Sequence, residues 1–307
     1  MKKTLILAIL AILMLSSCDN FKEGQEIPAY IKFKGFYLEE NPNFTFSQSE
    51  DLLTSDIRDV WVYVDGKILG AFPFHLDEDS SYYCSFPILK EGKHRISLRP
   101  GIIYNGMNNM REEYVFYTSY NDTIDLVPGQ EIVIEPQPIM YSDKFSMPLK
   151  ETFENYFVNF QQADVVGTEP LPMAIINNDS VRYGNHCGAI YFENGGHNKY
   201  ITIDSIFCNN TDGGIVLEID YYSNIPFEVG LYGRSQSEEA LKYISAVRLT
   251  PPQSGKWQKA YVLLSKVWNT LDYPTTFKVY LEAFNPNNVQ NSFIHIDNIK
   301  FVQYPNK

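Results

Sequence analysis

The chain has 307 residues and a formal net charge of −12, and it contains 22 tyrosines and 20 phenylalanines. This length suits two ordinary domains, and the negative charge argues against binding to nucleic acid or electrostatic binding to anionic lipid. Short apolar runs alternate with clusters of Gly, Pro, Asn and Asp, and aromatic residues favour strands. The composition therefore predicts an all-β protein, and the resemblances given below imply that it is made of two β-sandwich domains.

The first residues have the pattern of an export signal. Lys2 and Lys3 precede an uninterrupted apolar run, Leu5–Leu15, which as a helix would span about half of a ~30 Å bilayer core. Residues 1–17 are therefore a predicted signal peptide rather than a transmembrane helix. The next residue is Cys18, and the four residues that end there resemble the lipobox of bacterial lipoproteins.

That resemblance implies cleavage before Cys18 and attachment of acyl chains, palmitate among them, to this residue. Residues 18–26 then form a lipidated tether, and the acyl chains hold the protein at a membrane. The predicted location is the outer membrane or the cell surface.

A first unit is predicted at residues 27–139. Asp59–Gly70 reads as two strands around the dipeptide Asp65-Gly66, which suits a type I′ hairpin turn. Together with His94–Gly101 this segment resembles the PEGA domain, which implies an immunoglobulin-like sandwich that acts as a spacer. Tyr114–Tyr120 and Glu131–Pro136 are predicted to be the closing strands.

A second unit is predicted at residues 145–307, after a polar bridge. It begins with Phe153-Glu154 and later contains Gly255–Leu264 and the final strand Ile294–Phe301. In this order the three segments resemble the galactose-binding-like jelly roll that many carbohydrate-binding modules share. The resemblance also implies a structural calcium ion bound by Glu154 and Asp297, although no other cofactor is expected.

Strand alternation gives this unit a polar face on which rings and charges are interleaved. The residues predicted to share that face are Glu218, Asp220, Tyr222, Glu228, Tyr232, Lys278, Tyr280, Glu282 and Phe284. Sugar rings stack on aromatic rings, and their hydroxyl groups bond to charged groups, so this mixture suits a glycan. The candidate ligand-binding residues are Tyr222, Tyr232, Lys278, Tyr280 and Glu282, with a second patch at Trp268 and Tyr273 in a predicted loop. A face that is simply solvated or covered by protein remains the alternative.

Two kinds of covalent modification are also predicted. Cys187 and Cys208 lie in neighbouring predicted strands and are candidates for a disulfide, whereas three buried thiols, with Cys84, are the alternative. Three Asp-Ser/Thr-aliphatic triplets resemble an O-glycan acceptor of exported bacterial proteins, with Thr123, Ser180 and Ser205 as the acceptors.

The sequence contains no catalytic signature. It lacks a Gly-x-Ser-x-Gly elbow, a His-Glu-x-x-His motif and a glycine-rich phosphate loop, so we do not expect an enzyme. The predicted function is that of a non-catalytic envelope lipoprotein whose C-terminal jelly roll binds glycans, a layout that resembles lipid-anchored proteins of starch-uptake systems. The alternative is a structural or adhesive component of an envelope assembly, with an envelope protein covering the same face.

Overall fold

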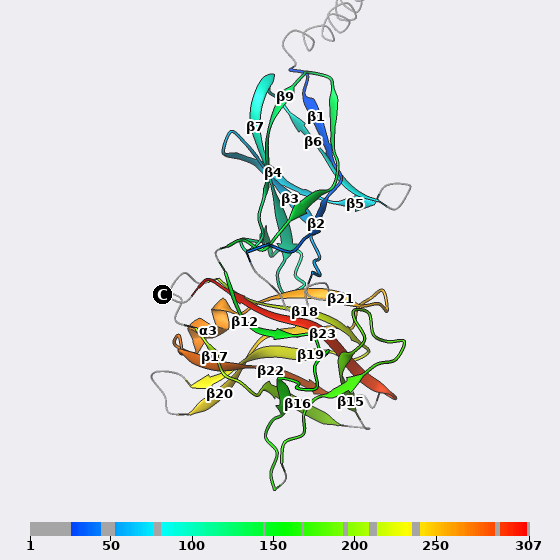
Figure 1. Ribbon diagram of the computed structural model, residues 1–307, viewed down its shortest axis with the longest axis vertical. Coiled ribbons are helices and arrows are strands. Elements are labelled where there is room, and N and C mark those ends of the chain that lie inside the picture. The colour runs from blue at the N-terminus through cyan, green and yellow to red at the C-terminus, as the bar shows by residue number, and fades with distance from the viewer. Residues whose placement is uncertain are drawn as a thin grey trace, which may run out of the picture.

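The computed structural model describes residues 26–43, 53–76, 81–143, 145–167, 169–192, 196–208, 214–234, 240–285 and 289–305. Strands make up 57% of the chain and helix 2%, which confirms the all-β fold class. Two β-sandwiches lie end to end (Figure 1). The predicted signal peptide and Cys18 lie outside the described residues. Within the described ranges no helix is long and apolar enough to cross a membrane.

The first sandwich packs a four-stranded sheet against a five-stranded sheet. The four-stranded sheet has the order β10-β1-β6-β5 and consists of β1 (Ala29–Phe33), β5 (His75–Leu76), β6 (Tyr82–Ile88) and β10 (Glu131–Ile134). The five-stranded sheet has the order β4-β3-β7-β8, with β9 beside β7, and consists of β3 (Asp59–Val64), β4 (Lys67–Pro73), β7 (Gly92–Ile103), β8 (Arg111–Glu113) and β9 (Tyr120–Leu126). A short parallel pair is formed by β2 (Phe36–Leu38) and β11 (Gln137–Ile139).

The hairpin between β3 and β4 has the predicted turn. Asp65 has φ of 51° and Gly66 has φ of 77°, so both central residues are left-handed, as a type I′ turn requires. Val60, Val62 and Val64 of β3 are buried, and the side chains between them face outward. The type I′ turn and the alternation of buried and outward-facing side chains along β3 together set the register of this hairpin.

The expected strand at Tyr114–Tyr120 is wrong. The Tyr117 amide donates to the Tyr114 carbonyl oxygen at 3.1 Å, so the chain turns there, and β9 begins only at Tyr120. Tyr114, Phe116 and Tyr117 are all buried. Their rings all pack into the junction with the second sandwich, whereas in a strand successive side chains would point to opposite faces. Packing against a distant segment therefore determines the local structure here.

The second sandwich consists of two six-stranded sheets and one described helix, α3 (Ser265–Thr270). The sheet nearer to the first sandwich, here the proximal sheet, has the order β14-β15-β23-β18-β21, with β12 beside β23. Its strands are β12 (Ser146–Glu151), β14 (Ala174–Ile176), β15 (Cys187–Phe192), β18 (Ile215–Ser223), β21 (Gln258–Leu263) and β23 (Ser292–Gln303).

The other sheet, here the distal sheet, lies on the side away from the first sandwich (Figure 1). It has the order β13-β16-β22-β19-β20, with β17 beside β22. Its strands are β13 (Phe160–Gln162), β16 (His197–Thr202), β17 (Ile206–Phe207), β19 (Phe227–Arg234), β20 (Leu241–Leu249) and β22 (Thr276–Phe284). The core between the sheets includes Leu217, Ile219, Leu231, Val279, Leu281 and Phe301.

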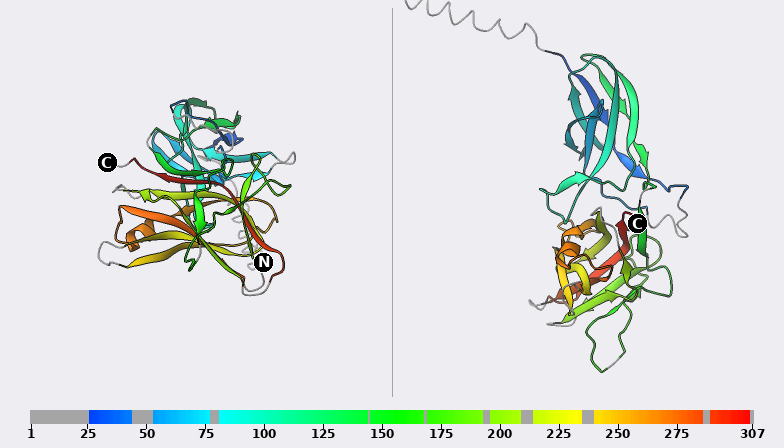
Figure 2. Two further views of the ribbon diagram at one scale, coloured as in Figure 1. Left: turned by 60° about the horizontal axis from the view of Figure 1, so that its bottom comes forward. Right: turned by 90° about the vertical axis from the view of Figure 1, so that its left-hand side faces the viewer.

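The two sandwiches share a buried aromatic cluster, and the right-hand view in Figure 2 shows one stacked above the other. The first sandwich and the connecting segment contribute Tyr104, Tyr114, Phe116, Tyr117, Ile139, Tyr141 and Phe145, and the proximal sheet contributes Val216, Tyr261 and Val302. The Asn105 amide also donates to the Tyr261 carbonyl oxygen at 2.8 Å. The connecting segment, predicted to be a polar bridge, is thus part of an apolar interface that fixes one sandwich on the other.

Buried charges lie beneath this aromatic cluster. One carboxylate oxygen of Glu218 accepts hydrogen bonds from the hydroxyls of Tyr114 (2.6 Å) and Tyr141 (2.8 Å), and the other lies 3.1 Å from Lys300 Nζ and 3.2 Å from Lys259 Nζ. Burial opposes ionisation of Glu218, but the two lysines together with the two tyrosine hydroxyls outweigh it and lower its pKa below the usual value. The predicted open face is therefore wrong for Glu218 and Asp220, which the first sandwich covers and which are 0% and 1% exposed.

Candidate ligand-binding sites

The outer face of the distal sheet carries three neighbouring tyrosines. Tyr232 of β19 lies opposite Tyr243 of β20, and their rings stack with centroids 4.2 Å apart. Tyr280 of β22 meets Tyr243 edge-to-face at 5.1 Å. These rings, together with Lys199, His197, Glu282 and Lys278, are referred to below as the tyrosine face.

A glycine makes room for this arrangement. Gly230 of β19 is paired with Tyr280 and lies at a register shift between β19 and β20. A Cβ atom at this position would come within 2.6 Å of the Tyr280 ring and 2.2 Å of the Ile244 carbonyl oxygen. The bare backbone therefore lets the Tyr280 ring lie flat over the sheet, where it is 2% exposed and supports Tyr243.

Charged groups surround the rings. Lys199 Nζ lies 3.9 Å from the centroid of the Tyr243 ring, 3.0 Å from Asp164 Oδ2 and 3.4 Å from Glu282 Oε1. Burial opposes the charge on Lys199, but the two carboxylates outweigh it and raise the lysine pKa above its ordinary value. His197 Nε2 lies 2.6 Å from Glu282 Oε1. The face thus offers fixed donors and acceptors beside aromatic surface.

The structure brings together four of the five predicted ligand-binding residues of the strands. Tyr232, Lys278, Tyr280 and Glu282 all lie on the tyrosine face, although the Lys278 ammonium donates to the Ile203 carbonyl oxygen at 2.7 Å. The sequence reasoning missed Tyr243 because it assigned no strand at Leu241–Leu249. The alternation of Ile244 and Ala246 with polar neighbours was the available signal for that strand.

Tyr222, the fifth residue, belongs to the other sheet. It lies at the end of β18 in an aromatic cluster with Tyr191, Phe293 and His295. A cavity of about 530 Å³ opens beside this cluster. The nine predicted residues were assigned to one face because alternation tells which side of a strand a residue occupies but not which sheet the strand joins.

The second predicted patch is not a loop surface. Trp268 lies in α3, is 4% exposed and donates its indole N–H to the Pro274 carbonyl oxygen at 2.9 Å. Only Tyr273 is open, at 47% exposed, and its ring meets Trp268 edge-to-face. Trp268 therefore holds the helix on the core, and it is not available to a ligand.

The predicted disulfide is wrong. Cys187 and Cys208 are both buried and no disulfide joins them. Cys208 belongs to the core between the sheets. Ile190 and Phe192 of β15 point into that core, and Cys187, on the opposite face of the same strand, points to the outer side of the proximal sheet. Burial raises the pKa of the Cys187 thiol, and that of Cys84, to about 12.

The two predicted calcium ligands each have other partners in the structure. Glu154 accepts hydrogen bonds from the amides of Asn185 (2.7 Å) and His186 (2.8 Å), and Asp297 is buried in β23 and accepts from the Asn298 amide. Among the described residues, no group of three or more His, Cys, Asp or Glu side chains could share a metal ion. Calcium binding stays a prediction.

The predicted O-glycan acceptors lie at three separate places. Thr123 in β9 and Ser205 before β17 are exposed, whereas Ser180 is half-buried and its carbonyl oxygen accepts from the Trp257 indole. The modification itself stays a prediction.

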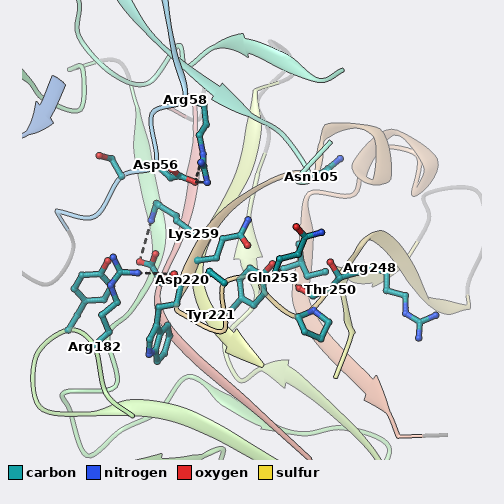
Figure 3. A pocket seen from close by; sticks show the side chains of 18 residues that line it. Asp56, Arg58, Asn105, Arg182, Asp220, Tyr221, Arg248, Thr250, Gln253 and Lys259 are labelled. Atoms are coloured by element: carbon teal, nitrogen blue, oxygen red, sulfur yellow. Dashed lines mark hydrogen bonds and ion pairs between the residues drawn. The ribbon is translucent and has the colours of Figure 1, made fainter. Parts of the chain in front are cut away.

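A polar cleft of about 510 Å³ opens where the two sandwiches meet. Figure 3 shows Asp56 and Arg58 projecting from the first sandwich towards Lys259 and Asp220 of the second, with Arg182 beside them. The Thr54 hydroxyl donates to Asp220 at 2.6 Å and accepts from Lys259 at 2.9 Å, so a segment of the first sandwich helps to form the floor of the cleft.

Comparison with known proteins gives similarity to solved structures only. No protein-family model matches the chain, and no curated protein sequence matches it. A structure concerned with the promiscuous specificity of carbohydrate-binding modules from the β-sandwich superfamily is 12% identical, with a TM-score of 0.35 over 80% of this chain and 85% of that one. A family 11 carbohydrate-binding module from Clostridium thermocellum, in complex with a β-1,3-1,4-mixed-linked tetrasaccharide, is 12% identical, with a TM-score of 0.37 over 54% of this chain and 99% of that one.

An adhesin domain of Lys-gingipain from Porphyromonas gingivalis is also similar. It is 14% identical, with a TM-score of 0.34 over 52% of this chain and 98% of that one. At these levels of identity the likeness concerns the fold alone.

Proposed function

We propose that this protein is a non-catalytic, lipid-anchored protein of the cell envelope that binds glycans through the tyrosine face. The observation that carries the proposal is the stack of Tyr232 on Tyr243, supported from below by Tyr280, on an outer sheet face that the first sandwich leaves open. Such rings offer the flat apolar surface on which the CH groups of a sugar stack.

The charged groups at the edge of these rings fit the hydroxyl groups of the same ligand. Lys199 is a donor, while Glu282 and Asp164 supply acceptors, and their mutual ion pairs hold all three in place before a ligand arrives. Such fixed groups lose little side-chain entropy on binding. The carboxylates are engaged with Lys199, His197 and the Tyr243 hydroxyl, so we assign them to positioning and recognition rather than to acid–base catalysis.

A panel of immobilised neutral polysaccharides tests this proposal. We expect the full chain to be retained by at least one of them, and Tyr243→Ala to weaken binding about tenfold, or about 1.4 kcal/mol. Tyr243→Phe removes only the hydroxyl that donates to Asp164 and should weaken binding less. Tyr30→Ala, at a residue of the first sandwich that is 42% exposed, is the matched control and should bind as the wild type does.

Two results would contradict the proposal. Retention that Tyr232→Ala and Tyr243→Ala both leave unchanged would place the glycan elsewhere on the molecule. Lack of retention by every polysaccharide would favour the structural or adhesive role, in which an envelope protein covers this face. Incorporation of radiolabelled palmitate by the wild type, but not by Cys18→Ser, is the separate test of the lipid anchor.

A further inference from the structure

The cleft between the sandwiches is a second site, away from the tyrosine face. Its walls come from both domains: Asp56, Arg58 and Asn105, with the adjacent Ser55 and Gly106, belong to the first sandwich, and Arg182, Trp257 and the other lining residues belong to the second. The aromatic cluster and the buried ion pairs behind it fix the two walls relative to each other. The cleft is therefore preformed, and its volume of about 510 Å³ is in the range of small-molecule sites.

The charge of the cleft is opposite to that of the whole chain. Four cationic side chains line it, namely Arg58, Arg182, Arg248 and Lys259, against the two carboxylates Asp56 and Asp220, in a chain whose net charge is −12. The two carboxylates are already neutralised. Arg58 binds Asp56 through two nitrogens at 2.9 and 2.7 Å, and Asp220 lies 3.6 Å from Lys259 Nζ.

Arg182 and Arg248 are the two lining cations for which the described residues provide no ion pair. Figure 3 shows the Arg248 side chain pointing away from the cleft, so Arg182 is the one directed to a ligand in it. Its Nη1 donates to the Trp257 carbonyl oxygen at 3.0 Å, its guanidinium lies 4.9 Å from the centroid of the Tyr183 ring, and the residue is exposed. In the described part of the chain no carboxylate lies within ion-pair distance of it. The hydrogen bond to Trp257 fixes the guanidinium but uses only one of its five N–H groups, so the planar fork can still bind a carboxylate with two parallel hydrogen bonds.

The remaining lining suits a sugar rather than a bare anion. Trp257 and Tyr183 are half-buried aromatic rings beside Arg182, and the opposite rim supplies Thr250 and Gln253, which are exposed (Figure 3). Hydroxyl and amide groups bond to sugar hydroxyls, and aromatic rings accept their apolar faces. A small inorganic anion would leave most of these groups without contact.

We propose that the interdomain cleft binds a carboxylate-bearing saccharide, with Arg182 pairing with the carboxylate and Trp257 and Tyr183 lining the sugar. This site is independent of the tyrosine face, and it gives the first sandwich a direct part in ligand binding. Arg58 keeps its wall of the cleft in place through its ion pair with Asp56.

Isothermal titration of the full chain with trigalacturonate, at low and at moderate salt, tests the proposal. We expect saturable binding that weakens as salt rises, because an exposed ion pair is screened. Arg182→Gln should weaken it about tenfold or more, and Arg182→Lys should restore it only in part, because an ammonium lacks the planar fork. Arg95→Gln, at an exposed arginine on the first sandwich, is the matched control and should leave the affinity unchanged.

Two further ligands test separately whether the charge and the sugar of trigalacturonate are needed for binding. Neutral galactotriose and inorganic phosphate should each bind this cleft at least tenfold more weakly than trigalacturonate, which would support both the charge and the sugar component. Equal affinity for galactotriose would overturn the role of the charge, and equal affinity for phosphate would overturn the role of the sugar. No binding of trigalacturonate, or binding that Arg182→Gln leaves intact at an unchanged melting temperature, would overturn the site itself. Tyr243→Ala should leave trigalacturonate binding unchanged, so a failure here is distinct from a failure at the tyrosine face.

Discussion

Lys300 and Glu218 lie 3.1 Å apart, Nζ to Oε2, and both side chains are completely buried where one sandwich covers the other. Neither would be stable alone in an apolar interior, because an unpaired buried charge loses its hydration. Lys259 forms a second ion pair with Glu218, and the hydroxyls of Tyr114 and Tyr141 donate hydrogen bonds to its other carboxylate oxygen. The junction thus uses polar groups whose contacts are satisfied only when the two sandwiches meet in this one orientation.

Glu218→Gln should destabilise the protein by about 3–5 kcal/mol. It leaves the buried ammonium groups of Lys259 and Lys300 with a single carboxylate, that of Asp220, to balance their charge. Urea unfolding, followed by tyrosine and tryptophan fluorescence, measures the loss. Glu131→Gln, at an exposed position of β10, should stay within about 0.5 kcal/mol of the wild type. A change at Glu218 as small as that of the control would mean that the ion pairs do not hold the junction.

The pH dependence of stability should report on Lys300. Burial lowers its pKa from 10.5 to about 8, only partly offset by Glu218, so the folded state releases this proton at a lower pH than the unfolded state does. Between those two values the unfolded state binds more protons, and stability from this group rises with pH. Lys300 alone contributes a rise of about 2 kcal/mol between pH 8 and pH 9.5. The buried Cys84 and Cys187 thiols, whose pKa values are raised, act in the opposite direction over this range, so the Lys300 contribution is measured as the difference between the wild type and a variant that lacks Lys300.

Lys300→Met removes the titrating group, so the stability of the wild type relative to this variant should increase by about 2 kcal/mol between the two pH values. The exposed Lys266→Met should instead follow the wild type at both pH values. Urea unfolding at both pH values gives the comparison. A slope that Lys300→Met leaves unaltered would assign the effect to other groups.

Local signals predicted local features well. The Asp65-Gly66 turn and the period-two burial of β3 follow from residues within one hairpin, and the sequence reasoning placed both correctly. Alternation also assigned Tyr232, Lys278, Tyr280 and Glu282 to one face, and this was correct because the strands that carry them, β19 and β22, pair in the same sheet.

The errors share a different origin. The local sequence pattern places Glu218 and Asp220 on a surface and Tyr114–Tyr120 in a strand. Each of these segments is instead buried by residues that lie about a hundred positions or more away in the chain, and a local pattern does not contain that information. Cys187 and Cys208 failed as a disulfide for a similar reason, since neighbouring strands in sequence joined opposite sheets. In each case the structure depends on contacts between distant segments, and the hydrophobic periodicity of a single segment does not predict such contacts.

Gly230→Ala should disturb the tyrosine face from beneath. The added Cβ would meet the Tyr280 ring and the Ile244 carbonyl oxygen at distances that real side chains do not adopt, so strand or ring must shift. We expect a loss of about 1–3 kcal/mol of stability together with weaker glycan binding. Gly70→Ala, in β4 of the first sandwich, is the matched control, because an added Cβ atom there would come no closer than 3.3 Å to a ring carbon of Phe72. Unchanged glycan affinity in Gly230→Ala would show that the position of Tyr280 does not matter for the ligand.

The cysteines should be unreactive in the folded protein. Burial raises the pKa of the Cys84 and Cys187 thiols to about 12, so almost no thiolate is present at pH 8, and Cys208 is buried in the core. We expect iodoacetamide to leave all three unmodified in the native protein and to modify all three in guanidinium chloride, as measured by intact mass. Because no disulfide joins Cys187 to Cys208, dithiothreitol should not lower the melting temperature. A melting temperature that falls by several degrees on reduction, or an intact mass that is two units low before reduction, would show that Cys187 and Cys208 are bridged. The Cys187 side chain would then have to turn inward.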